Sequence, residues 1–174
     1  AHAMTARLLA LGHRRIGFII GNTNQTASAL RLQGYRRALA EAGIAADESL
    51  IAPGDFTYRS GLDAAERLLA LPARPTAIFA SNDDMAAAAV AVAHRHHLDV
   101  PEDLSVCGFD DSTRATTIWP ELTTIRQPIA EMARRATLLL AEAVRHKQAE
   151  AAPPQHVRLA YELVSRDSDG PPHN

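Results

Sequence analysis

Four predicted strands end in groups of mostly polar residues, at 22–25, 55–56, 82–83 and 110–111. These ends, and the helix after the first strand, supply side chains that could bind a hydroxyl-rich small molecule. They comprise an arginine, an aromatic ring, an amide and a carboxylate: Arg31, Phe56, Asn82 and Asp110. Arginine donates hydrogen bonds through a planar fork, a carboxylate accepts them, an amide does both, and a ring covers an apolar C–H face. Ligands of open parallel sheets bind beyond the carboxyl ends of the strands. We therefore expect these four side chains to line one binding edge, with Arg31 turning back from the helix after the first strand.

Each of these positions also has a purely structural explanation. Asn82 and Asp83 could cap the helix that follows them, Asp55 could be a turn residue, and Phe56 could cover the core. Taken singly, every position fits that explanation better. The convergence of four strand ends on one edge favours a binding site.

Catalytic and metal-binding motifs are absent from the sequence. It contains no G-x-S-x-G, no G-x-G-x-x-G after the first predicted strand and no G-x-x-x-x-G-K-[ST]. His94, His96 and His97 crowd the end of a predicted helix, where basic side chains favour the helix dipole, so we expect solvated histidines there. We expect no catalytic residue, no metal and no cofactor, and we do not expect an enzyme.

Length and charge set the class of protein. The chain has 174 residues, 18 Lys and Arg against 20 Asp and Glu, and a single cysteine, Cys107. One cysteine excludes a disulfide framework, and the near-neutral charge argues against a chain that itself grips nucleic acid. No apolar run approaches the roughly 18 residues of a membrane span. These features predict a soluble, cytoplasmic chain of one domain, or of one domain with an appendage.

The hydrophobic pattern alternates short apolar runs with longer segments of helical period, which is typical of βα units around a parallel sheet. Strands are predicted at 16–20, 50–52, 76–80, 104–109 and 123–125, with a last extended segment at 157–164. Helices are predicted at 27–42, 62–69, 82–97 and 129–144, a polar loop at 148–154, and no element before residue 16. The predicted fold class is α/β, a Rossmann-like parallel sheet flanked by helices.

The predicted helix at 82–97 is apolar all round between Met85 and Ala93, so a single contact face does not account for it. We expect the sheet to cover one side and a partner subunit the other. An exposed tryptophan before a proline is more often an interface anchor than a lone surface ring, although Trp119 could also fold onto its own sheet. The expected dimer interface includes four residues: Met85, Ala89, Ile118 and Trp119.

Six sequence blocks, in order, resemble the lactose/galactose-repressor (LacI/GalR) family of bacterial transcription regulators. They lie at 11–16, 31–35, 54–56, 75–86, 100–111 and 120–128. The resemblance implies a type I periplasmic-binding-protein fold, in which two Rossmann-like subdomains surround an effector cleft. It also implies five effector contacts: Arg31, Phe56, Asn82, Asp110 and Gln127. Family members often carry an aromatic residue where this chain has Ile129.

The resemblance further implies how the chain is divided. Residues 1–127 would form the C-terminal effector-binding subdomain, 128–160 elements of an otherwise missing N-terminal subdomain, 161–168 a strand that returns, and 169–174 a disordered tail. The helix at 129–144 then keeps an apolar stripe without its usual partner. Burying each Leu, Ile or Met is worth roughly 1.5–3 kcal/mol, so we expect this stripe to pack across a dimer interface or to swap between chains.

The family resemblance predicts the effector-binding and dimerising domain of a LacI-type DNA-binding regulator. Its partners would be a small effector (a sugar or related metabolite), a second copy of the chain, and operator DNA through a headpiece missing here. Two alternatives stay open. A periplasmic-type sugar-binding protein shares the fold without DNA, and an α/β enzyme would need a reactive side chain in the cleft.

Overall fold

The computed structural model describes residues 1–145 and 156–173. It contains two compact units, one made of residues 1–126 together with 163–174 and the other of residues 127–162. Each unit is described by itself.

The first unit is built on a four-stranded parallel sheet in the order β2-β1-β3-β4. The strands are β1 (Ile16–Ile20), β2 (Ile51–Pro53), β3 (Ala77–Ala80) and β4 (Ser105–Cys107). Phe18 of β1 lies opposite Ile51 on one side and Phe79 on the other. Because β3 and β4 are buried throughout, their sequences are apolar runs rather than alternating ones. The predicted α/β fold class is confirmed.

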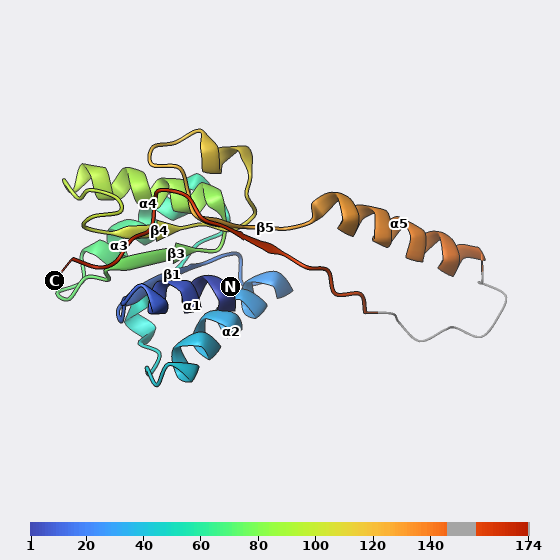
Figure 1. Ribbon diagram of the computed structural model, residues 1–174, viewed down its shortest axis with the longest axis horizontal. Helices are drawn as coiled ribbons and strands as arrows, with labels where there is room; N and C mark the ends of the chain where they lie inside the picture. The colour runs from blue at the N-terminus through green and yellow to red at the C-terminus, as the bar shows by residue number, and fades with distance from the viewer. Residues whose placement is uncertain (146–155, 174) are drawn as a thin grey trace. The chain divides into compact units, whose positions relative to one another are not determined.

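Helices cover both faces of this sheet (Figure 1). α1 (His2–Ala10) and α2 (Thr26–Glu41) lie on one face, and α3 (Tyr58–Leu69) and α4 (Asp83–Arg95) on the other. Side chains alternate between the two cores along each strand: Phe18 and Phe79 face α1 and α2, whereas Ile19 and Ile78 face α3 and α4. Two short 3-10 turns complete the unit, η1 (Glu48–Leu50) and η2 (Thr113–Thr116).

Helix α1 is an α-helix that the sequence did not predict. Met4 and Leu8 are fully buried in the core between the sheet and α2. They lie four residues apart and therefore on the same side of the helix. One such pair, in a segment of nine residues, is too short a pattern to indicate an amphipathic helix.

The C-terminal residues of the first unit are tied to the sheet. β6 (Glu162–Val164) pairs with β5 (Thr124–Arg126) in a separate two-stranded sheet. Val106 N of β4 donates to the carbonyl of Ser168 at 2.8 Å, and Thr123 N donates to Ser168 Oγ at 2.9 Å. Gly170 N donates to Ser105 Oγ at 3.0 Å. The prediction of a disordered tail at 169–174 is therefore wrong for Asp169 and Gly170. Polar hydrogen bonds hold these residues, and no hydrophobic pattern marks such an attachment in the sequence.

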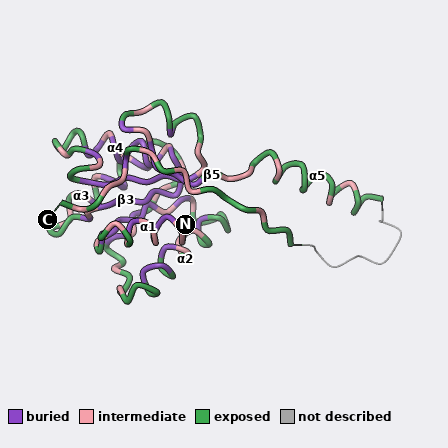
Figure 2. Tube along the Cα trace, viewed as in Figure 1, coloured by how far each residue is buried: buried purple, intermediate pink, exposed green. Residues whose placement is uncertain are grey.

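The second unit contains helix α5 (Ile129–Arg145), which matches the predicted helix at 129–144. None of its residues is buried, and the burial trace shows the contrast with the sheet and α4 (Figure 2). Large residues of the apolar stripe predicted for this helix are exposed: Ile129, Met132, Leu140 and Val144. The predicted loop at 148–154 lies outside the described residues. No helix of the described ranges is both long enough and apolar enough to cross a membrane.

Candidate functional site

Arg31 is the centre of a cluster at the carboxyl end of the sheet. Its Nη1 donates to the carbonyl of Ser81, the residue after β3, at 2.6 Å. Its Nη2 lies 3.5 Å from Asp110 Oδ1. The guanidinium carbon lies 3.9 Å from the centre of the Phe109 ring and 5.6 Å from that of Phe56, within the range of cation–π contacts. Burial lowers the pKa of Arg31, and Asp110 partly offsets this, but an arginine stays charged at any physiological pH.

Phe56 covers the end of β1. It follows β2 and has a φ of 75°, a conformation that L side chains adopt rarely. A methyl group at Gly21 would overlap its ring, so the glycine leaves the space that the ring occupies. Asn82 fixes this turn, because its Nδ2 donates to the Phe56 carbonyl at 2.8 Å.

Asn82 is also the N-cap of α4, where its Oδ1 accepts from Met85 N at 3.0 Å. The capping explanation and the site explanation therefore hold together, since one end of the amide caps the helix and the other holds Phe56. Asp55 is the turn residue that the structural explanation described, with Oδ1 accepting from Thr57 N at 2.9 Å. Hydrogen bonds from Ser60 and Thr57 lower the pKa of Asp55.

Asp110 presents its carboxylate at this edge from a segment with an unusual backbone. Its φ is 111° and that of Asp111 is 55°. Asp110 N donates to the carbonyl of Ile125 at 2.9 Å, and the side chain is 37% exposed. Direct contacts thus join four of the effector-contact residues predicted from the sequence: Arg31 with Asp110 and Phe56, and Phe56 with Asn82.

Gln127, the fifth predicted contact, is the first residue of the second unit. Its carbonyl accepts from Ile129 N at 2.9 Å. Its assignment to the effector cleft stays a prediction.

Asp83 is a residue of this edge whose role the sequence did not reveal. It is almost fully buried, and its carboxylate accepts from Ser112 N and from Thr124 Oγ1, each at 2.6 Å. Burial raises the pKa of Asp83, and the hydrogen bonds from Thr124 and Ser112 partly counter it. An acidic residue in the first turn of a helix looks like a dipole partner in sequence, so nothing local distinguishes this buried carboxylate.

The chain is similar in sequence and in structure to known proteins. The model of a family described as periplasmic binding protein-like domain matches residues 5–168. The chain belongs to the periplasmic binding protein-like domain family. Within it, the chain is 41% identical over 164 residues to the HTH-type transcriptional regulator CelR of Thermobifida fusca, covering 94% of this chain and 47% of that protein. It is 48% identical over 129 residues to the HTH-type transcriptional repressor CytR of Escherichia coli K12, covering 74% and 38% respectively.

A solved structure described as the transcriptional regulator CelR–cellobiose complex superposes on this chain with a TM-score of 0.87. It is 41% identical and covers 94% of this chain and 49% of that one. The resemblance to LacI-family regulators inferred from the sequence is thereby confirmed. The chain spans about half the length, or less, of the curated relatives it matches.

Two residues of the expected dimer interface lie in the core of this periplasmic binding protein-like domain. Met85 and Ala89 are 0% exposed in the single chain, so neither can contact a partner. The second side of α4 is covered by α3, where a methyl group at Gly61 would lie 2.7 Å from Met85 Cα. The expectation of a subunit contact through Met85 and Ala89 is wrong, because a neighbouring helix of the same chain buries them. Ile118 packs partly against the same core, whereas Trp119 is 76% exposed and stays a predicted interface residue.

The histidines at the end of α4 are not all merely solvated. His96 Nε2 lies 2.6 Å from Glu66 Oε2, and Arg95 pairs with the same carboxylate. Within the described ranges, no group of three or more His, Cys, Asp or Glu side chains could hold a metal ion.

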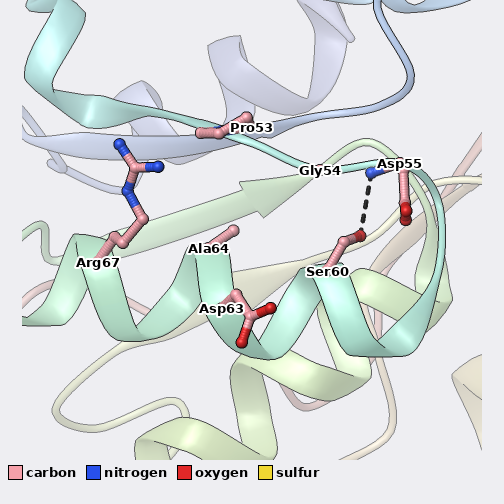
Figure 3. A pocket seen from close by; sticks show the side chains of 7 residues that line it. All are labelled: Pro53, Gly54, Asp55, Ser60, Asp63, Ala64 and Arg67. Atoms are coloured by element: carbon pink, nitrogen blue, oxygen red, sulfur yellow. Dashed lines mark hydrogen bonds between the residues drawn. The ribbon is translucent and has the colours of Figure 1, made fainter.

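A surface hollow of about 260 Å³ lies beside the cluster, between β2 and α3 (Figure 3). Polar, charged and apolar residues all line it: Pro53, Gly54, Asp55, Ser60, Asp63, Ala64 and Arg67. It shares with the strand-end positions only Asp55, whose amide donates to Ser60 Oγ at 3.0 Å. The hollow is therefore distinct from the edge that carries Arg31 and Asp110.

Two buried hydroxyls accompany Arg31. Ser28 and Ser81 are fully buried, and among the described residues their Oγ atoms have no hydrogen-bond partner. Ser81 follows Phe79 by two residues and so continues on the α2 side of the sheet. Ser28 lies one turn before Leu32, which packs into that same core. Both hydroxyls therefore belong to the layer between α2 and the sheet.

Proposed function

We propose that this chain is the effector-binding and dimerising part of a LacI-family transcriptional regulator. Its effector would be a sugar or a related hydroxyl-rich metabolite, bound where Arg31, Phe56, Asn82 and Asp110 meet. The observation that carries the proposal is the position of Arg31. It contacts the carbonyl of Ser81, which follows β3, and the carboxylate of Asp110, which follows the neighbouring strand β4.

The chemistry of this edge suits a neutral polyol. Asp110 accepts hydrogen bonds from hydroxyls, and the guanidinium of Arg31 donates to them. The rings of Phe56 and Phe109 supply apolar faces for the C–H side of a sugar. Arg31 and Asp110 form an oppositely charged pair, so each can hydrogen-bond to the hydroxyls of a ligand that carries no net charge.

The relatives support a sensory role rather than catalysis. CelR and CytR are transcriptional regulators by name, and the CelR structure is described as a cellobiose complex. By this similarity we propose a sugar effector, a homodimer that uses Ile118 and Trp119, and an effector contact from Gln127. We also propose a cytoplasmic, non-enzymatic protein that reaches operator DNA only through a separate headpiece. Effector binding would then alter DNA affinity through a coupling free energy of about 1–3 kcal/mol.

A ligand screen tests the proposal. Thermal shifts of the full-length protein with cellobiose, ribose and purine nucleosides should identify a stabilising ligand, and calorimetry should give its Kd. Arg31→Ala removes charged hydrogen bonds and should weaken binding on the order of 10- to 100-fold.

Arg36→Ala is the matched control, because Arg36 lies on the same helix and pairs with Glu48 at the surface. It should leave Kd unchanged. Equal losses in the two variants, or a ligand bound with wild-type affinity by Arg31→Ala, would contradict the site. Turnover of the ligand would contradict the sensory role.

A further inference from the structure

The segment that carries Asp110 is held from both sides by carboxylates that do not belong to the ligand-binding set. It runs from Gly108 to Ser112, between β4 and η2. Its backbone follows the strand beside it, since Gly108 N donates to Thr123 O and Asp110 N to Ile125 O, each at 2.9 Å. These two backbone bonds do not by themselves set the direction in which the Asp110 side chain points.

Asp83 holds one side of the segment. Its Oδ2 accepts from Ser112 N and its Oδ1 from Thr124 Oγ1, both at 2.6 Å. Gly108 packs directly against Asp83 Oδ1, with no room for a side chain. The buried carboxylate thus joins the beginning of α4 to the end of the segment and to β5.

Asp111 holds the other side. Its carboxylate is 8% exposed and accepts from Arg126 Nε and Arg166 Nη2, each at 2.6 Å. Arg166 also donates to the carbonyl of Leu122 at 2.7 Å. Burial alone would raise the pKa of Asp111, but the two arginines together lower it. These contacts give Asp111 a fixed position immediately beside Asp110.

The backbone next to these two attachments is strained. Asp110 and Asp111 both have positive φ, which costs free energy at residues other than glycine and persists only where surrounding contacts determine it. Together with the two backbone bonds of the segment, the contacts of Asp83 and Asp111 contribute to this determination. Without them the segment would relax, and the Asp110 carboxylate would turn away from Arg31.

We propose that Asp83 and Asp111 are positioning residues that hold the Asp110 carboxylate toward Arg31, so that ligand affinity depends on two carboxylates outside the ligand contact set. The inference has two parts, tested by a ligand arm and a structural arm of one experiment. The effect on ligand affinity rests on the proposed function, whereas the fixed geometry of the segment can be tested without any ligand.

The structural arm is hydrogen exchange measured residue by residue. Asp83→Ala removes both acceptors. The exchange rate of the Ser112 amide should then rise at least about 10-fold more than that of Phe79 in β3, because the Ser112 amide loses its partly buried hydrogen bond. Asp83→Asn is the conservative rescue. Its amide can accept from Ser112 and donate to Thr124 Oγ1, so the Ser112 exchange rate should return to within about 3-fold of wild type.

The ligand arm uses cellobiose first and then any sugar that stabilises the protein in the thermal screen. Asp83→Ala and Asp111→Ala should each weaken binding about 10-fold. Asp84→Ala should leave Kd and the Ser112 exchange unchanged, because Asp84 lies in the same helix turn but pairs with Arg114 at the surface. Thr124→Val, which keeps the side-chain volume, provides the same test with one hydrogen bond lost if the alanine variants fail to fold.

The outcomes separate the two hypotheses. If wild-type protein binds no sugar while Asp83→Ala accelerates Ser112 exchange selectively, the positioning holds and the proposed function fails. If Ser112 and Phe79 accelerate equally, or if Asp83→Asn is as damaged as Asp83→Ala, the positioning inference is overturned, whatever the ligand result.

Discussion

Helices α4 and α5 carry apolar residues that sequence reasoning assigns to a partner, but the structure treats them differently. On α4, Met85 and Ala89 are fully buried by α3 and the sheet of the same chain. On α5, no residue is buried, and Leu140 is 66% exposed. An apolar pattern therefore shows that a helix face must be covered but does not identify what covers it. For α4 the cover is a neighbouring helix, and for α5 the expected dimer contact or swap stays a prediction.

The largest expected effect is at the α3–α4 contact. Met85→Ala should lower the free energy of unfolding by about 2–5 kcal/mol, because it opens a cavity in a closed core. Chemical denaturation of the chain measures this. The change should alter neither the oligomeric state nor the slope of the transition, and a variant that dissociates an oligomer without losing stability would restore Met85 to an interface.

The second effect is a pH dependence confined to the first unit. His13 is buried, donates from Nε2 to the Gly170 carbonyl at 2.8 Å, and accepts at Nδ1 from Thr76. Burial lowers the pKa of His13, although the bond to Gly170 and the charge of Asp169 partly raise it. The unfolded state therefore binds the proton first, and stability should fall as the pH drops below about 6.5.

The slope cannot exceed about 1.4 kcal/mol per pH unit for one proton. His13→Gln should be less stable at pH 8 but should lose the slope between pH 7 and 5. Denaturation at several pH values measures both variants. A slope that persists in His13→Gln would assign it to another group.

A third effect separates satisfied from unsatisfied hydroxyls in the same core. Ser105→Ala should lower the free energy of unfolding by about 1 kcal/mol or more, because the Ser105 hydroxyl bonds both the amide and the carbonyl of Gly170. Ser28→Ala and Ser81→Ala remove hydroxyls without a partner among the described residues. They should leave stability unchanged or raise it by up to about 1 kcal/mol. Equal losses at all three serines would show that Ser28 and Ser81 have a bound partner such as an ordered water.

The smallest effect is expected on α5. Leu140→Ala should change the stability of a monomeric chain by no more than about 0.5 kcal/mol, as for most exposed positions. Paired with Met85→Ala, it measures the difference between the helices directly. A loss of about 2 kcal/mol or more that depends on protein concentration would show that α5 is covered by a second chain.

The sequence predicts the sheet and the helices around it because both follow from local hydrophobic period. The strands at 16–20 and 76–80 are recovered within a residue or so, since buried parallel strands are continuous apolar runs. The sequence does not predict helix α1, nor the hydrogen bonds that attach residues 168–170 to Thr123 and Ser105. The first depends on one pair of buried side chains, and the second depends on hydrogen bonds between residues far apart in the chain.

The candidate site divides in the same way. Arg31, Phe56, Asn82 and Asp110 are predictable because a parallel sheet brings its strand ends to one edge. Asp83 and Asp111 are not, because their partners Thr124, Arg126 and Arg166 come from later segments. The residues next to an aspartate in the sequence do not distinguish a buried carboxylate from one at an exposed helix start.

The shared carboxylate of Asp111 has one further consequence for the design of the chain. Arg126 is the last residue before the second unit, and Arg166 follows shortly after its end. Both arginines pair with the Asp111 carboxylate. The chain therefore enters and leaves the excursion, residues 127–162, close to the same side chain. The two ion pairs of Asp111 help to bring the ends of the excursion together. We expect that such an excursion can be shortened, lengthened or exchanged at little entropic cost to the α/β layer beneath it.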